Sequence, residues 1–290
     1  MKKIYFLTAI AALIISSCAK DNSYLESGQM QFKAEYPATK ATSTNFENGD
    51  AMGVFVTKYE NDKPLPLQIS GNYANNVKST YNGTKWTNSP AIYWEEGKFD
   101  IYAFYPYREL ASVDEQLFSI ALDQSTPETD NSLSGYESSD FLWAKSSGIS
   151  KMDVVPLKFS HLMSKLVINL IKGEDYTGEI PSMAEIKIHN TIPTAVIDIS
   201  TGMVTKYGYA PTKSITAKKI SDGVYTAIIV PQRLDNKLPL IEILSNGVSY
   251  FVESKFVFRS GTQHTVNITL NNNPDQVKIE FGGEIEGWKN

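Results

Sequence analysis

The chain of 290 residues has a formal net charge of −5, with 20% charged and 11% aromatic residues. An acidic chain with scattered lysines lacks the basic stripe of a nucleic-acid-binding surface, so we expect no nucleic-acid partner. A single cysteine excludes an intrachain disulfide, and stability must come from buried area, which a chain of this size can supply.

The first residues have the composition of a secretory signal. Lys2 and Lys3 precede an apolar run from Ile4 to Ile15, which is shorter than the about 20 residues that span a bilayer. The following Ser16-Ser17-Cys18, with Ile15, resembles the lipobox of bacterial lipoproteins, in which the cysteine becomes the first mature residue and carries acyl chains such as palmitate. We predict a signal peptide over residues 1–17 and lipidation at Cys18. A plain secretory signal with a coincidental cysteine is the alternative.

Lipidation at Cys18 would anchor the mature chain without a transmembrane helix. Each buried methylene contributes about 0.8 kcal/mol, so one acyl chain binds a membrane reversibly and two or more hold it stably. Residues 18–30 are polar and form the predicted tether, in which Lys20-Asp21 resembles the surface-export signal of some Gram-negative lipoproteins. The expected location is the cell surface, on a lipid anchor in the outer membrane.

Short strand-like segments follow one another up to about residue 155. Gln31 to Tyr36 alternates loosely, and the small polar run from Ala38 to Thr44 predicts an exposed link behind this first strand. Asn82-Gly83 is a strong hairpin signal. Prolines predict a loop between Lys58 and Gly71, and polar residues predict another from Asp123 to Ser139. Further strands are predicted at Met52–Val56, Val77–Tyr81, from Trp86, at Phe99–Tyr105 and at Phe141–Ala144.

The second half of the chain begins with Val154 to Ile171, the most apolar stretch after the signal. We predict a helical turn at Phe159–Ser164 and a central strand at Lys165–Ile171. Alternating or β-branched segments predict the remaining strands at Glu185–His189, Ala195–Ile199, Tyr225–Val230, Leu240–Ile243, Val248–Val252, Thr265–Leu270 and Val277–Phe281.

No run of helical length has a 3.6-residue period after the signal. Many short strands at roughly ten-residue spacing, joined by Gly, Pro and Asn turns, are typical of antiparallel β-sandwiches. The predicted fold class is all-β, with two tandem antiparallel β-sandwich domains over residues 31–155 and 156–290.

The sequence lacks the common catalytic and metal-binding motifs, and we expect no enzyme activity, metal or cofactor. His161, His189 and His264 are widely separated, and no His-Glu-x-x-His or Gly-x-Ser-x-Gly motif occurs. Ser160 and His161 are adjacent, but neighbours along a strand point to opposite faces, so His161 is predicted to be packed and hydrogen-bonded.

Two further groups of residues allow more than one interpretation. Glu95-Glu96 and Glu284 with Glu286 are predicted to be solvated turns rather than paired carboxylates of a glycosidase. The aromatic segments Tyr93-Trp94 and Tyr102–Tyr107 are predicted to be strand core, with stacking on sugars as the alternative.

Several blocks resemble the fimbrillin family of surface lipoproteins. They occur in order from about residue 30 to the end of the chain: Phe46–Phe55, Ile92–Trp94, Tyr102–Tyr107, Leu157–His161, Ile229–Gln232 and Gly283–Trp288. The resemblance implies two transthyretin-like β-sandwich domains and a role as a structural subunit of surface fimbriae, in contact with other fimbrial subunits and contributing to adhesion.

The family also implies assembly by strand exchange, in which a protease removes the first strand and a neighbour's strand replaces it. Carried onto this chain, Lys40-Ala41 is the first candidate cleavage site and Lys33-Ala34 the second. The best-known subunits are cut after arginine, a departure that leaves cleavage of this chain open. The strand Val277–Phe281 is the candidate donor.

Two functions from different classes follow. The first is a fimbrial subunit that polymerises after cleavage. The alternative is a monomeric surface lipoprotein that binds a carbohydrate or host protein, or a fimbrial anchor or tip adhesin.

Overall fold

The computed structural model describes residues 28–37, 45–129, 132–273 and 278–286, with side chains up to Glu284. Within these ranges the chain forms β-strands and one short 3-10 helix, η1 (Glu137–Ser139). The predicted all-β fold class is confirmed. Among the described residues, no helix has both the length and the apolar character needed to cross a membrane.

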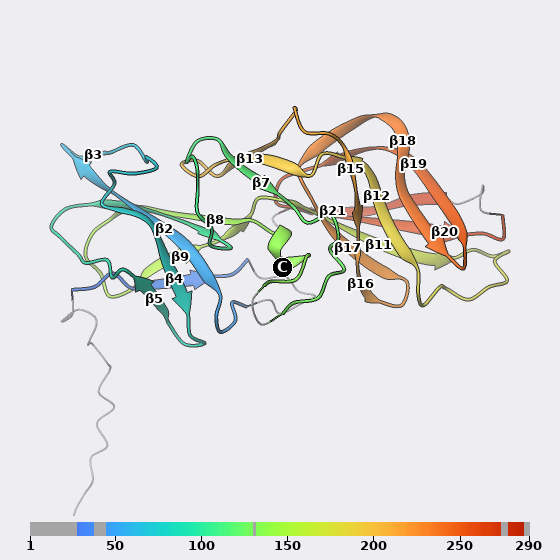
Figure 1. Ribbon diagram of the computed structural model, residues 1–290, viewed down its shortest axis with the longest axis horizontal. Helices are drawn as coiled ribbons and strands as arrows, with labels where there is room; N and C mark the ends of the chain where they lie inside the picture. The colour runs from blue at the N-terminus through green and yellow to red at the C-terminus, as the bar shows by residue number, and fades with distance from the viewer. Residues whose placement is uncertain (1–27, 38–44, 130–131, 274–277, 287–290) are drawn as a thin grey trace, which may run out of the picture.

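One end of the elongated molecule is built on a large antiparallel sheet (Figure 1). Its order is β10-β8-β6-β2-β4-β5, with β3 paired to β2. The strands are β2 (Ala51–Glu60), β3 (Lys63–Pro64), β4 (Ala74–Tyr81), β5 (Trp86–Ser89), β6 (Phe99–Tyr105), β8 (Leu142–Ile149) and β10 (Ser160–His161). A separate two-stranded parallel sheet consists of β1 (Phe32–Glu35) and β9 (Val155–Lys158).

The other end contains two larger sheets, and a small sheet lies between the two ends (Figure 1). The five-stranded sheet has the order β16 (Lys218–Ser221), β17 (Val224–Ile229), β11 (Ser164–Lys172), β20 (Thr262–Leu270) and β21 (Lys278–Glu286). The four-stranded sheet has the order β15 (Lys213–Thr216), β12 (Glu185–Thr191), β18 (Gln232–Ser245) and β19 (Val248–Phe258). The small sheet has the order β14 (Met203–Lys206), β13 (Thr194–Asp198) and β7 (Gln116–Ser119).

The order of buried and exposed residues along a strand shows whether one face of its sheet or both faces are covered by other parts of the protein. Buried residues alternate along β11 and β20, as expected where one face packs on a core. All residues of β6 are buried, and so are the six central residues of β2, because both faces of their sheet are covered. The hairpin at Asn82-Gly83 is confirmed: it joins β4 to β5, and Gly83 has a φ of +87°.

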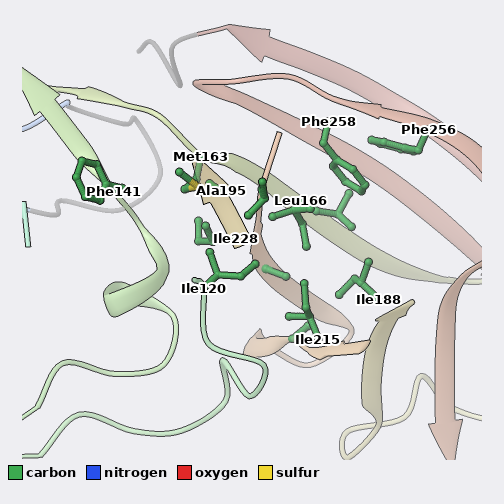
Figure 2. Packing of buried hydrophobic residues seen from close by; sticks show 14 of the residues in the cluster. Ile120, Phe141, Met163, Leu166, Ile188, Ala195, Ile215, Ile228, Phe256 and Phe258 are labelled. Atoms are coloured by element: carbon green, nitrogen blue, oxygen red, sulfur yellow. The ribbon is translucent and has the colours of Figure 1, made fainter. Parts of the chain in front are cut away.

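Two clusters of buried hydrophobic residues lie on opposite faces of the large sheet. The first lies between this sheet, β1 and β9, and includes Met30, Phe32 and Phe159. The second contains Phe104 from the other face of the sheet and continues into the far end of the molecule through Phe141 and Leu166. Figure 2 shows part of this second cluster, with Phe141 at one side and Phe256 and Phe258 at the other.

Three local predictions were wrong. The segment predicted as a helical turn contains β10 and the start of β11, because Ser160 and His161 pair with β8. The first part of the predicted loop after Lys58 contains the end of β2 and the short β3, which pair with each other, whereas residues 65–71 lie outside strands as predicted. Glu284 and Glu286 lie in β21 rather than in a turn, although Glu95, Glu96 and Glu284 are exposed as predicted.

Two of the sheets depart from the predicted antiparallel pairing: the two-stranded sheet is parallel and the five-stranded sheet is mixed. The β1–β9 and β11–β20 pairs are parallel. β7 precedes the predicted boundary near residue 155 but pairs with β13, which follows it. The division into two domains at this boundary stays a prediction.

Candidate functional site

The first candidate site is the position of β1, the strand predicted to be detachable. Phe32 to Glu35 pair in parallel with Val155 to Lys158, and β9 is the only strand beside β1 in the described residues. Two backbone hydrogen bonds extend this pairing: Val155 N–H donates to Gln31 O at 2.8 Å, and Phe159 N–H donates to Glu35 O at 3.1 Å.

The residues just before β1 are held by a second segment. Met30 N–H donates to Ile92 O at 2.8 Å, and Trp94 N–H donates to Gly28 O at 2.7 Å. The side-chain amide of Asn88 donates to Met30 O at 3.0 Å. Residues 28–35 are therefore fixed by one stretch of chain at their start and by β9 at their end.

One face of this segment is inserted into the hydrophobic core. Met30 is 0% exposed and Phe32 is 4% exposed, and Ala34 packs against the same cluster. These three residues are two positions apart, so they share one face of the strand. Lys33 and Glu35 lie on the other face, with Nζ and Oε1 3.8 Å apart. Residues 30–34 thus carry a row of apolar side chains that pack into this core.

An aromatic cluster covers the end of β1. The Tyr36 ring lies edge-on to Phe46, with centroids 5.1 Å apart, and to His161 at 5.9 Å. Phe46 in turn contacts the rings of Trp86, Tyr105 and Phe159 at 5.0–5.6 Å. The chain between Tyr36 and Phe46 passes through residues 38–44, which lie outside the described residues.

The predicted processing residues fall in different places. Cys18, Lys40 and Ala41 lie outside the described residues. Lys33 and Ala34 lie within β1, opposite Pro156 and Leu157. A protease binds its substrate as a free extended chain, and the backbone at Lys33-Ala34 is held in a sheet. All of these assignments stay predictions.

The candidate donor strand is longer than predicted. β21 runs from Lys278 to Glu286, at the edge of its sheet, and pairs antiparallel with β20. Its Phe281 is 60% exposed, so β21 inserts less into the core than β1 does.

His161 is packed and hydrogen-bonded, as predicted. It is 5% exposed, and its Nδ1 lies 2.8 Å from Asp140 Oδ2. Ser160, its neighbour in β10, is exposed on the opposite face. Asp140 also raises the pKa of Lys165, but burial is the larger effect, and the pKa of Lys165 lies below its usual value.

The predicted core aromatics are buried only in part, because Trp94 and Tyr107 are half-buried and Tyr93 is exposed. Tyr102, Phe104 and Tyr105 are at most 6% exposed, whereas Tyr93 is 51% exposed. Burial raises the pKa of Tyr105, whose hydroxyl donates to Asp50 Oδ1 at 2.8 Å.

One polar cluster was missed by the sequence-based reasoning. His189 Nδ1 lies 2.7 Å from Ser214 Oγ, and His189 Nε2 lies 2.9 Å from Glu242 Oε2. The three residues come from neighbouring strands β15, β12 and β18, and their proximity depends on strand register. One sequence signal could have indicated this cluster: each of the three residues is next to an isoleucine whose side chain is buried, so each points to the opposite, outer face of the sheet. These isoleucines are Ile188, Ile215 and Ile241. Among the described residues, no group of three or more His, Cys, Asp or Glu side chains could hold a metal ion.

These features define an all-β protein whose first strand completes a hydrophobic core from the N-terminal end of the chain. The model of the fimbrillin-like family matches residues 39–288, and the chain belongs to this family. Comparison with the curated proteins finds no match.

Solved structures with the same fold cover nearly the whole chain. A candidate cell adhesion protein from Bacteroides uniformis has 22% identity and a TM-score of 0.67, over 91% of this chain and 99% of that one. A second, from Bacteroides ovatus, has 19% identity and a TM-score of 0.67, over 89% and 97%. The tip fimbrial protein Mfa3 from Porphyromonas gingivalis has 8% identity and a TM-score of 0.50, over 83% and 95%. At these identities the likeness shows a shared fold.

Proposed function

We propose that this protein is a structural subunit of cell-surface fimbriae, exported as a lipoprotein and assembled by strand exchange with other subunits. Membership of the fimbrillin-like family supports a non-enzymatic role at the cell surface. The observation that carries the proposal is that Met30, just before β1, and Phe32, in β1, are 0% and 4% exposed, whereas β1 pairs with a single strand in the described part of the chain.

The first step is anchoring. Acyl chains on Cys18 hold the exported chain on the outer membrane, and residues after Cys18 form the tether. The folded part of the chain after the tether, called the body from here on, can then reach the cell surface with β1 in place.

The second step is removal of β1. Cleavage at Lys40-Ala41 separates residues 28–36 from the body, and with them the lipid anchor. Loss of Met30 and Phe32 exposes an apolar groove, and loss of β1 leaves the backbone groups of β9 without a strand partner. Both defects make the body an acceptor for another strand.

The third step is donation of a strand by another subunit. Val277, Ile279 and Phe281 are two positions apart, as are Met30, Phe32 and Ala34. A strand with three alternating apolar residues can replace β1 in the groove, provided that it first leaves β20.

Limited trypsin digestion tests whether cleavage at Lys40-Ala41 must precede polymerisation. The full mature chain should lose the residues up to Lys40 and form a ladder of polymers on a gel, with fibres visible by electron microscopy. Lys40→Ala should remain monomeric under the same conditions. The matched control is Lys20→Ala in the tether, which removes a tryptic site but leaves Lys40-Ala41 and should polymerise like the wild type.

Two outcomes would contradict the proposal. One is a body that loses residues 18–40 but stays monomeric at all concentrations. The other is equal polymerisation of the Lys40→Ala variant, because β1 would then not need to leave. A monomer that binds glycans would instead favour the monomeric surface lipoprotein.

A further inference from the structure

A pocket of about 220 Å³ opens on the outer face of the four-stranded sheet β15-β12-β18-β19. The residues used in the argument are His189, Asn190, Lys213, Ser214, Pro239 and Phe251, all of which line it. The isoleucines next to them along the strands are buried on the inner face. The pocket is therefore separate from the β1 groove and from the cores.

A β-bulge creates the hollow. Between β12 and β15 the register moves from Ile188 opposite Ile215 to Thr191 opposite Lys213, so β12 carries one extra residue there. Asn190 takes up the extra length with a φ of +59°, in the left-handed region that asparagine tolerates. Its side-chain amide donates to Pro239 O at 2.8 Å, which joins β12 to β18 where their pairing has ended. Bulges of this kind redirect side chains at the surface of a sheet.

A chain of hydrogen bonds orients the polar groups beside the hollow. Glu242 Oε2 lies 2.9 Å from His189 Nε2, and Glu242 Oε1 accepts from Ser249 Oγ at 2.9 Å. Burial raises the pKa of Glu242, but the hydrogen bonds from Ser249 and His189, together with the electrostatic effects of His189 and Lys187, lower it by more, so the carboxylate is ionised. The carboxylate accepts the Nε2–H of His189, and His189 Nδ1 lies 2.7 Å from Ser214 Oγ, within hydrogen-bond distance.

This arrangement determines what the pocket offers to a ligand. Whichever of Ser214 Oγ and His189 Nδ1 is the donor, Ser214 Oγ keeps a lone pair that can accept a hydrogen bond from a ligand. The Asn190 amide hydrogen is directed to Pro239 O, and Asn190 Oδ1 is an acceptor. The Lys213 ammonium group, on an exposed residue at the rim, is a donor. The site thus combines two acceptors held by hydrogen bonds with a donor on the exposed Lys213.

An aromatic ring forms the remaining wall. Phe251 is 51% exposed on the outer face of β19, and its ring centroid lies 6.2 Å from that of His189. Leaving this ring in water is unfavourable by about 25 cal/mol per Å² of apolar area. A ligand with one apolar face and polar groups around its edge would cover the ring and meet the acceptors and donor at once.

We propose that this pocket binds one pyranose unit of a glycan. The C–H face of the sugar ring packs on Phe251, its hydroxyl groups donate to Ser214 Oγ and Asn190 Oδ1, and one hydroxyl oxygen accepts from Lys213. The volume lies below the roughly 300–1,000 Å³ of pockets for drug-sized ligands, which suits a single ring with the rest of the glycan in solvent. Binding here does not require polymerisation.

Titration of the full mature chain with sugars tests the site. The probes are D-glucose, D-galactose, D-mannose, L-fucose, N-acetylglucosamine, N-acetylgalactosamine, glucuronic acid and sialic acid. We expect saturation-transfer NMR to detect at least one of them, and the imidazole signals of His189 to shift while those of His161 and His264 stay in place. Phe251→Ala should weaken the binding about tenfold or more, and Ser214→Ala should weaken it several-fold.

The matched control is Tyr93→Ala, because Tyr93 is also an aromatic residue that is 51% exposed, and it lies outside the four-stranded sheet. This variant should bind the sugar as the wild type does, and thermal melts of all variants report whether they fold. The proposal is overturned if none of the sugars binds, if Tyr93→Ala loses as much affinity as Phe251→Ala, or if a bound sugar leaves the His189 signals unchanged.

Discussion

His264 shows how burial outweighs a neighbouring carboxylate in setting the pKa of a residue in this protein. Its side chain is 2% exposed in β20, next to the rings of Phe256 and Phe258. Arg259 N–H donates to His264 Nε2 at 3.2 Å, and His264 Nδ1 lies 3.2 Å from Glu284 Oε1. Burial lowers the pKa of His264 below 6.5, Glu284 raises it by less, and Arg259 lowers it further.

This pKa shift predicts a pH dependence of stability. In the unfolded chain His264 takes up a proton near pH 6.5, whereas the folded state resists protonation until a lower pH. The stabilisation is therefore present above about pH 6.5 and is lost as the pH falls from there toward the folded pKa. We expect the free energy of unfolding in urea to decrease between pH 7 and pH 5, and the decrease to be smaller in His264→Gln. The same slope in both proteins would contradict this expectation.

At the scale of strands, β1 and β21 differ in how much they contribute to the core. Phe32 in β1 is 4% exposed, whereas Phe281 in β21 is 60% exposed. Both strands have one partner strand, β9 and β20 respectively. The stability of β1 therefore depends on its side chains more than on its short pairing.

Matched substitutions measure this difference. Phe32→Ala should lower the free energy of unfolding by about 3–5 kcal/mol, because it leaves a cavity in a packed core. Phe281→Ala should change it by less than about 1 kcal/mol, since an exposed side chain loses little contact. Urea denaturation of the uncleaved chain compares the two. Similar decreases in the free energy of unfolding in the two variants would indicate that β1 is not held by its apolar face.

Across the whole molecule, the second hydrophobic cluster joins both ends. Phe55, Phe104 and Phe118 belong to the same cluster as Leu166 and Ile228. The first three precede the predicted domain boundary near residue 155 and the last two follow it. Figure 1 places β7 and β13, which pair with each other, between the two ends.

Truncation tests whether the second half is an independent domain. A fragment of residues 156–290 lacks β7 and the large buried aromatics of the first half, each worth about 1.5–3 kcal/mol. Their combined loss is comparable to the whole stability of a domain, about 5–15 kcal/mol. We expect the fragment to show no cooperative thermal transition by circular dichroism under conditions in which the full chain melts cooperatively. A sharp transition in the fragment would support the predicted boundary instead.

The sequence by itself determined the all-β class, the hairpin at Asn82-Gly83 and the central strand around Lys165–Ile171, because alternation and turn chemistry are local properties. It also indicated the first strand and the family. It could not determine that β2 and β6 are buried on both faces, or that Ser160–His161 is a strand, because both depend on segments distant in the chain. The contact of His189 with Ser214 and Glu242 was decided by tertiary structure alone, since a bulge and the register of three strands bring these residues together.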